Sequence, residues 1–103
     1  MYRMTILYGT PLDPEHFRRY YLEQHIPIAR RMRGLTGWNL SWIDEPGDIF
    51  LIAELYAPDR AALEEILASR EGVAAREDLD NFVTGGVTFL MGPEEQVALG
   101  DVR

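Results

Sequence analysis

The 103-residue sequence contains no cysteine and no lysine. Without cysteine, the chain has no disulfide, thiolate nucleophile, zinc finger or cysteine-ligated iron–sulfur cluster. All ten basic residues are arginine. Because Schiff-base chemistry needs a lysine amine, aldolase-like and pyridoxal-phosphate mechanisms are excluded.

The sequence also lacks a long apolar run and an excess of positive charge. No segment reaches the roughly 18 consecutive apolar residues typical of a transmembrane helix, and no basic-then-apolar leader opens the chain. The net charge of −7 repels nucleic acid and anionic membranes. We therefore expect neither nucleic acid nor a membrane as a partner, and we expect a cytoplasmic location.

What the chain does contain is an ordinary globular composition, with 47% hydrophobic and 26% charged residues. Its length predicts one domain spanning residues 1–103, with a core of about 2–92 and a C-terminal tail at 93–103. Alternation of apolar and polar residues, together with turn residues and helix caps, predicts the elements. These are a strand at 2–9, a helix from Pro14 to about Gly34, strands at 36–44 and 49–56, a helix after Asp59 that Gly72 interrupts, a shorter helix at 73–82, and a strand at 83–91.

This βαββαβ order predicts an α+β, ferredoxin-like fold with an antiparallel four-stranded sheet. The third strand is apolar on both faces: Phe50, Ile52 and Tyr56 lie opposite Leu51 and its neighbours. Two helices cover only one face of such a sheet, so the other face needs a second cover. We therefore expect a homodimer with the two sheets face to face. Within the last strand, Gly85 and Gly86 indicate a bulge or a close approach to a ligand.

The first helix combines a titratable ring with a helix breaker. At about 100° per residue, His25 shares a face with apolar side chains, and Pro27 removes a hydrogen bond to Glu23, so a kink should leave space beside His25. His16 lies on the opposite side of the helix, so the two histidines cannot chelate one metal, and no metal site is expected. The predicted sheet-facing residues are Phe17, Tyr21, Gln24, His25, Ile28 and Met32.

The segment "FRRYYLEQHIPIARRM" resembles the EthD family of the dimeric α+β barrel superfamily. The pattern is an aromatic residue, an aromatic pair and His-x-Pro, matched by Phe17, Tyr20, Tyr21, His25 and Pro27. The later "DLDNFV" also looks like this superfamily. The resemblance implies a dimer with a cleft between helices and sheet in each subunit. Related proteins include cofactor-free monooxygenases and lactone isomerases, some members bind haem, and EthD proteins are often labelled reductases.

The candidate site gathers around His25. Either His25 is a partly buried histidine hydrogen-bonded to Tyr21 or a backbone carbonyl, or it is a general acid or base assisted by Tyr21. Trp38 and Trp42 are either core or dimer contacts or part of an aromatic-binding pocket. Asp78 and Asp80 are interpreted as a solvated helix end. The residues assigned to substrate binding are Tyr8, Phe17, Ile28, Met32, Trp38 and Phe82.

Two main functions follow. The first is an oxidoreductase-, monooxygenase- or isomerase-type enzyme that acts on a small apolar cyclic or aromatic compound, with proton transfer or substrate-driven oxygen chemistry and no cofactor. The second is a non-enzymatic protein that binds or carries such a compound in the same cleft. A third interpretation is haem binding, with His25 as the axial ligand.

Overall fold

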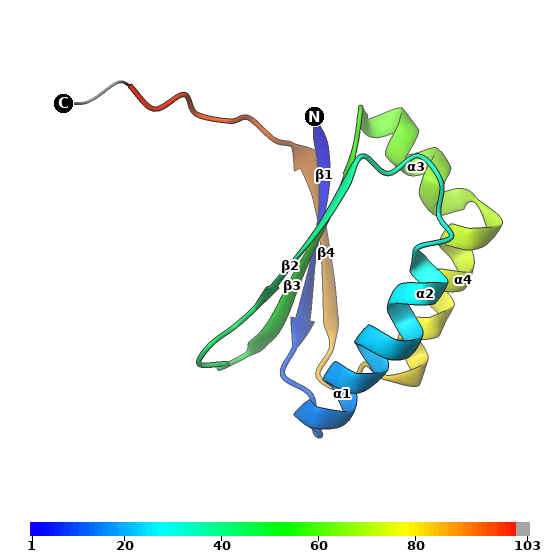
Figure 1. Cartoon of the computed structure of the whole chain (residues 1–103), viewed down its shortest axis with the longest axis vertical. Coiled ribbons are helices and arrows are strands. Elements are labelled where there is room, and N and C mark those ends of the chain that lie inside the picture. The colour runs from blue at the N-terminus through cyan, green and yellow to red at the C-terminus, as the bar shows by residue number, and fades with distance from the viewer. Residues whose placement is uncertain (101–103) are drawn as a thin grey trace.

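The computed structural model describes residues 1–100 (Figure 1). Its elements follow the predicted βαββαβ order, with the first helical segment in three parts and the second in three parts. They are β1 (Tyr2–Gly9), α1 (Pro14–Tyr20), η1 (Tyr21–His25), α2 (Ile26–Ala29), β2 (Gly37–Trp42), β3 (Ile49–Ala57), α3 (Arg60–Ala68), α4 (Arg70–Asp78), η2 (Leu79–Asn81) and β4 (Val87–Pro93).

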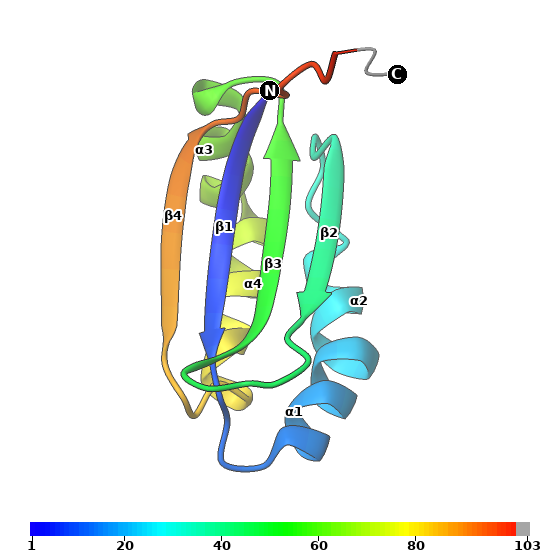
Figure 2. The ribbon, with the colours of Figure 1, turned by 90° about the vertical axis from the view of Figure 1, so that its left-hand side faces the viewer.

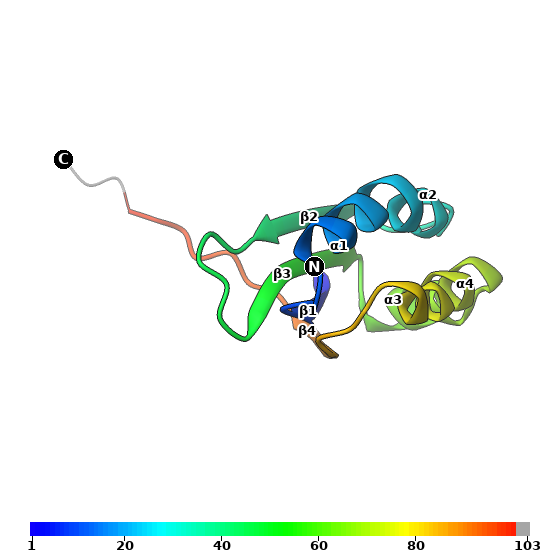
Figure 3. The ribbon, with the colours of Figure 1, turned by 90° about the horizontal axis from the view of Figure 1, so that it is seen from below.

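The four strands form one sheet in the order β2-β3-β1-β4, and every neighbouring pair is antiparallel. All helices lie on one face of this sheet (Figures 2 and 3). The predicted α+β, ferredoxin-like fold with an antiparallel four-stranded sheet is therefore confirmed. No helix within residues 1–100 is both long enough and apolar enough to cross a bilayer. The predicted tail continues beyond β4, and its last residues, 101–103, lie outside the described part of the chain.

The first helix begins as predicted and ends earlier. Asp13 caps it, accepting a hydrogen bond from the backbone N–H of His16 at 3.1 Å. The helix ends at Ala29, so the predicted end near Gly34 was wrong. Tight turns close it, with the N–H of Met32 donating to the carbonyl of Ala29 at 3.1 Å. Met32 lies beyond this end and is still buried, with only 8% of it exposed.

A π-helix, η1, stands where the sequence predicts a simple kink. The N–H of Ile26 donates to the carbonyl of Tyr21, five residues back, just before Pro27 removes the next donor. At this wider turn, His25 keeps its predicted place facing the sheet and Gln24 does not. His25 faces inward and is 4% exposed. Gln24 is exposed, so its predicted place on the packing face was wrong.

The second helical segment breaks at Ser69, not at Gly72 as predicted. Ser69 has an extended backbone, and its hydroxyl caps α4 by accepting from the N–H of Gly72 at 3.1 Å. Gly72 lies in the first turn of α4, against the backbone carbonyls of Ile66 and Leu67. It is therefore a close-packing position rather than a helix breaker.

The two glycines before the last strand also differ from the prediction. β4 begins at Val87, so Gly85 and Gly86 lie in the preceding loop and form no bulge within the strand. Gly86 has a positive φ of 87°, and its carbonyl accepts from the N–H of Gly9 at 2.9 Å. The close approach is therefore between two segments of the protein backbone, the end of β1 and the loop before β4.

The core lies between the sheet and the helices, where Leu51, Ala53 and Leu55 of β3 are at most 3% exposed. Phe50 was predicted on the opposite face, and this was wrong. Its ring lies 5.4 Å from that of Phe17, on the helix side. The β1–β3 register shifts between Tyr8 and Gly9, and this irregularity lets Phe50 join the core.

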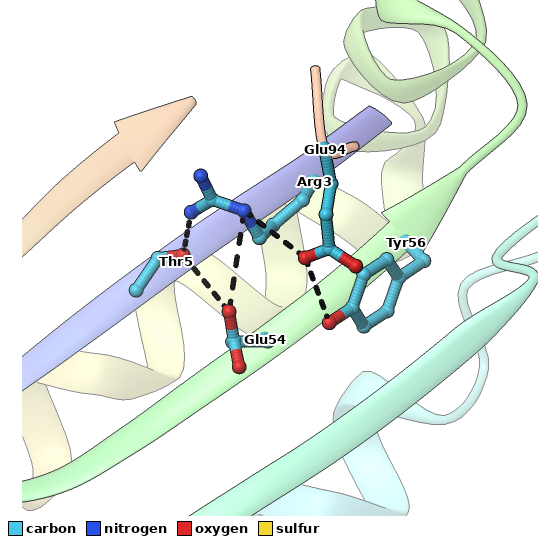
Figure 4. A network of polar contacts seen from close by, with 5 residues as sticks. All are labelled: Arg3, Thr5, Glu54, Tyr56 and Glu94. Atoms are coloured by element: carbon cyan, nitrogen blue, oxygen red, sulfur yellow. Dashed lines mark hydrogen bonds and ion pairs between the residues drawn. The ribbon is translucent and has the colours of Figure 1, made fainter. Parts of the chain in front are cut away.

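The uncovered sheet face carries a polar network at one end (Figure 4). Arg3 Nε lies 3.4 Å from Glu94 Oε1 and 4.0 Å from Glu54 Oε2. The Tyr56 hydroxyl donates to Glu94 Oε1 at 3.2 Å, and Arg3 also contacts Thr5. Beside this network, Leu7, Ile52 and Leu90 lie on the same face by strand register. Face-to-face dimerisation remains a prediction.

Candidate functional site

A cavity of about 330 Å³ lies between the sheet and the helices. This volume is near the lower end of the ~300–1,000 Å³ range of small-molecule sites, so it suits a small ligand. Its walls are mostly apolar, and its polar groups converge near His25. The sheet contributes Met4, Ile6, Tyr8, Trp38 and Leu55 to this cavity, and the first helical segment contributes Tyr21, His25, Ala29 and Met32.

The exposed residues of the cavity lining come from β4 and α4. Phe89 and Met91 line it from the edge strand and are each 42% exposed. Arg76 lines it from α4 and is also exposed. A ligand that enters from this side would pass the side chains of Phe89, Met91 and Arg76.

The predicted ligand-binding residues divide into two groups. Tyr8, Met32 and Trp38 line the cavity together with Tyr21 and His25. The remaining three, Phe17, Ile28 and Phe82, do not.

Aromatic packing explains where two of these three residues lie. Phe17 is 1% exposed within a cluster that includes the rings of Tyr8 and Tyr21. Phe82 is 3% exposed and lies 4.9 Å from the His25 ring, measured between centroids. Phe17 and Phe82 therefore support the cavity wall from behind.

The principal polar contact of the site joins His25 to Asp78, at the end of α4. His25 Nδ1 lies 2.9 Å from Asp78 Oδ2, and the two side chains are each 6% exposed. Asp78 accepts two further hydrogen bonds at Oδ1, from the Tyr20 hydroxyl at 2.7 Å and from Asn81 Nδ2 at 2.9 Å. The interpretation of Asp78 as a solvated carboxylate was wrong, because it is a buried acceptor with three donors.

These contacts fix the charge of Asp78. Burial raises the pKa of its carboxyl group, but the hydrogen bonds from Asn81, Tyr20 and His25 together lower it, and the net pKa lies below its ordinary value. Asp78 is therefore an anion at neutral pH. The same hydrogen bond raises the pKa of Tyr20, which keeps its proton and donates it to Asp78.

The contact with Asp78 and the burial of the ring also determine the tautomer of His25. Burial lowers the pKa of His25, and this outweighs the hydrogen bond and the negative charge of Asp78, which raise it. The ring is therefore neutral at pH 7. Because an ionised carboxylate only accepts, Nδ1 carries the proton and Nε2 is left as the unprotonated nitrogen.

Two buried donors lie near the Tyr21 hydroxyl. The Tyr8 hydroxyl and the Trp38 indole Nε1 make no hydrogen bond of 3.5 Å or less within residues 1–100. Burial raises the pKa of Tyr21, and hydrogen bonding from the nearby Trp38 and Tyr8 side chains acts against this by lowering it. Burial likewise raises the pKa of Tyr8, so both phenols stay protonated.

Trp42 lies outside the cavity. Its ring packs edge-to-face against Tyr21 and Phe50, with centroids 6.0 and 5.8 Å apart, and the Arg18 guanidinium lies 4.4 Å above it. Of the two tryptophans, only Trp38 lines the cavity. Within the described chain, no three histidine or carboxylate side chains gather as a metal site would require.

The sequence reasoning missed Asp78 and its partners Tyr20 and Asn81. A signal was present: Ala75, Asp78, Leu79 and Phe82 recur at helical spacing, which places a carboxylate on an apolar face. A carboxylate in that position needs donors, and an inward-facing histidine is an obvious one.

Comparison with known proteins identifies the family. Residues 9–86 match the EthD domain. An uncharacterized 11.0 kDa protein in the thcB–thcC intergenic region of Rhodococcus erythropolis is 35% identical over 101 residues, covering 94% of this chain and 98% of that protein. The chain belongs to the EthD family, as its sequence predicted.

Solved structures with a similar fold include a member of the same family. An EthD family protein from Bacillus halodurans has a TM-score of 0.87 at 26% identity, with 92% of this chain and 99% of that chain covered. SnoaB, a cofactor-independent oxygenase from Streptomyces nogalater, has a TM-score of 0.69 at 12% identity, with 93% and 94% covered. The second likeness shows the fold alone.

Proposed function

We propose that this protein is an enzyme that removes a proton from a small apolar cyclic or aromatic compound, with His25 as the base. The observation that carries the proposal is His25, which lies in the wall of an apolar cavity and contacts Asp78 through Nδ1. A neutral imidazole with Nδ1 held by an anion presents Nε2 as an acceptor, which is the arrangement a general base needs.

Asp78 supports the charge that develops on His25. When Nε2 accepts the substrate proton, the imidazolium that forms lies 2.9 Å from an anionic carboxylate. Their attraction is strong because water is excluded from both groups. Tyr20 and Asn81 hold the carboxylate in place, so the imidazole keeps its orientation during the transfer.

The chemistry starts at a carbon next to a carbonyl, or at a phenol. The proton moves to Nε2, and the electron pair that is left delocalises onto the substrate oxygen. Return of the proton to another carbon isomerises the compound. Electron transfer from the carbanion to dioxygen, as co-reactant, begins an oxygenation instead. The SnoaB likeness is compatible with the second outcome, but Nε2 performs the same first step in both.

The apolar walls define the substrate further. Met4, Ile6, Met32 and Leu55 offer no polar group to a ligand. At roughly 25 cal/mol per Å² of apolar surface removed from water, binding should depend mainly on ring burial. Highly charged substrates are disfavoured because the cavity carries only the exposed Arg76 at its mouth.

Exchange of substrate protons with solvent tests this function. The protein is incubated in D₂O with cyclohexanone, 1-indanone and a small phenol, and deuterium incorporation is followed by NMR. Acceleration of exchange at the α-carbon of one ketone is expected. If all compounds exchange at the buffer rate, and affinity does not change between about pH 5 and 8, the protein is a binding or carrier protein instead.

We also propose that two copies associate through the uncovered sheet faces. Leu90 is 49% exposed on this face, beside Leu7 and Ile52. The neighbouring polar groups of this face are already paired with one another, so burying them leaves few donors unsatisfied (Figure 4). Sedimentation that shows a monomer at micromolar concentration would rule this assembly out.

A further inference from the structure

We propose that Arg76 binds an anionic group of the substrate, which makes a small ring compound with one carboxylate the substrate class. This inference deepens the proposed function and rests on it. It starts from the charges in the cavity lining. Within residues 1–100, Arg76 is the only residue with a permanent charge that lines the cavity.

The guanidinium of Arg76 has no partner in the described part of the chain. On α3, Arg60 Nε lies 3.5 Å from Glu64 Oε2, four residues along the helix. Arg76 has Asp80 at the same spacing, but Asp80 belongs to η2, beyond the end of α4. No ion pair or side-chain hydrogen bond of Arg76 forms within residues 1–100. The cation is therefore available to a ligand.

The sequence of α4 directs this side chain along the cavity. Helical residues four apart share a face, and their side chains lean toward the N-terminal end of the helix. This geometry directs Arg76 toward Gly72, and both residues line the cavity. Because Gly72 has no side chain, none at that position separates Arg76 from the cavity.

Apolar side chains make up the rest of the exposed lining. Phe89 and Met91 of β4 are each 42% exposed and offer an anion no hydrogen bond. A guanidinium, in contrast, binds a carboxylate through two parallel hydrogen bonds. The net charge of −7 repels anions from the protein as a whole. Attraction of a carboxylate would therefore report a local contact with Arg76.

The position of α4 links this anion site to the base. Two residues after Arg76, Asp78 Oδ2 lies 2.9 Å from Nδ1 of His25, which also lines the cavity. A ligand that meets both Arg76 and His25 carries its reacting carbon and its carboxylate at different ends. The carboxylate keeps its charge throughout proton transfer, so Arg76 should raise the affinity and leave the rate at saturation unchanged.

The test compares 3-oxoindane-1-carboxylate with 3-oxoindane-1-carboxamide, in which a neutral amide replaces the anion. NMR titration at low and high ionic strength gives both affinities for the wild type, Arg76→Gln and Arg70→Gln. Arg70→Gln is the matched control, because Arg70 is exposed on α4, outside the cavity lining, and its replacement changes the net charge equally. Proton exchange at C2 of the ring in D₂O gives the rate and the half-saturating concentration.

The ratio of carboxylate to carboxamide affinity should be about fivefold lower in Arg76→Gln than in the wild type, the upper end for an exposed ion pair. Arg70→Gln should keep the wild-type ratio. Arg76→Gln should also raise the half-saturating concentration of the carboxylate without changing its exchange rate at saturation. Because salt screens the contact, the wild-type ratio should fall as ionic strength rises.

An equal ratio in Arg76→Gln and the wild type, an equal loss in Arg70→Gln, or no detectable carboxylate binding by the wild type overturns the anion site. If a variant fails to fold, the salt dependence of the wild type decides. Repulsion by the net charge alone would make the ratio rise with ionic strength, and a rising or constant ratio contradicts the site.

His25→Gln separates this inference from the proposed function, since it should keep the affinity ratio and lose proton exchange. A wild type that prefers the carboxylate in this way but exchanges protons only at the buffer rate would reject the function and keep the anion site. Accelerated exchange without any contribution of Arg76 to carboxylate affinity would reject the anion site and keep the function.

Discussion

Asp78 Oδ2 lies 2.9 Å from His25 Nδ1, although 53 residues separate the two in the sequence. His25 ends the π-helix, Asp78 ends α4, and packing of the first helical segment against α4 brings them together. Through this contact the carboxylate gains a hydrogen-bond donor, and the imidazole is held in one tautomer. The consequences of this contact are open to direct measurement.

Replacing Asp78 with asparagine should weaken both stability and proton transfer. The amide keeps the size of the side chain but removes the charge that His25 and Tyr20 donate to. We expect a loss of about 2 kcal/mol in the free energy of unfolding, typical of a hydrogen bond to a charged group. The pKa of His25 should fall further, because the carboxylate raises it. Urea denaturation and NMR titration measure these quantities.

Asp80→Asn is the matched control for that variant. Asp80 is exposed, two residues along the chain, and its replacement should change the free energy of unfolding by less than about 0.5 kcal/mol. Equal losses in the two variants would show that the Asp78 contact has no special weight.

Acidification should destabilise the protein in two stages. Burial depresses the pKa of folded His25 below 6.5, so the unfolded chain binds its proton at a higher pH than the folded chain does. The free energy of unfolding is therefore full above about pH 6.5 and falls as pH decreases below it. Asp78, with a pKa below 3.8 in the folded state, adds a second loss as pH falls below about 4.

Denaturation measured across pH checks this prediction. His25→Gln should abolish the first stage and leave the second. His16→Gln removes the exposed histidine of α1 and controls for the loss of an imidazole. A first stage that persists in His25→Gln would assign it to another group.

Adding a methyl group at Gly72 should destabilise the fold. A Cβ there would meet the carbonyl oxygens of Ile66 and Leu67, which are backbone atoms and cannot move aside easily. Gly72→Ala should cost about 1–3 kcal/mol, as overpacking does, measured by thermal or urea denaturation. Gly47→Ala, where no atom lies within 4 Å of the added Cβ, should be close to neutral. Similar stability for both variants would contradict the close packing of α3 and α4.

A charge on the uncovered sheet face should dissociate the proposed dimer. Leu90→Arg places a guanidinium on this face in register with Thr5, where dimerisation would have to take the charge out of water. Sedimentation should show a dimer for the wild type and a monomer for the variant. Leu12→Arg, at an 89% exposed position in the β1–α1 loop, should stay dimeric. A wild type and variant of the same mass would argue against this interface.

Much of the fold was predictable because local chemistry specifies it. The caps Asp13 and Asp59 begin their helices as expected, and strand periodicity placed β1 and β3 within a residue. The misplaced boundaries involve tertiary context. Gly72 looks like a helix breaker in the sequence, but its lack of a side chain serves the packing of α4 against carbonyls that only the folded chain brings near.

Part of the candidate site could be predicted from the sequence. Helical periodicity placed His25 and Tyr21 inward, and β1 alternation placed Tyr8 in the core. Asp78 was missed because a carboxylate near a helix end is usually solvated. The burial of Asp78 depends on three hydrogen-bond donors: Tyr20 and His25 are distant in the sequence, and Asn81 is one helical turn away. The preferences of single residues do not predict such a set.

The proposed function depends most on His25 as the base, and solvent exchange of 1-indanone tests this role most directly. In D₂O, the wild type and His16→Gln should accelerate exchange at the α-carbon. His25→Gln should slow it by about 10²–10⁴-fold, the contribution of a general base, while its affinity for 1-indanone stays unchanged. Equal exchange rates for His25→Gln and the wild type would contradict the role of His25 as the base.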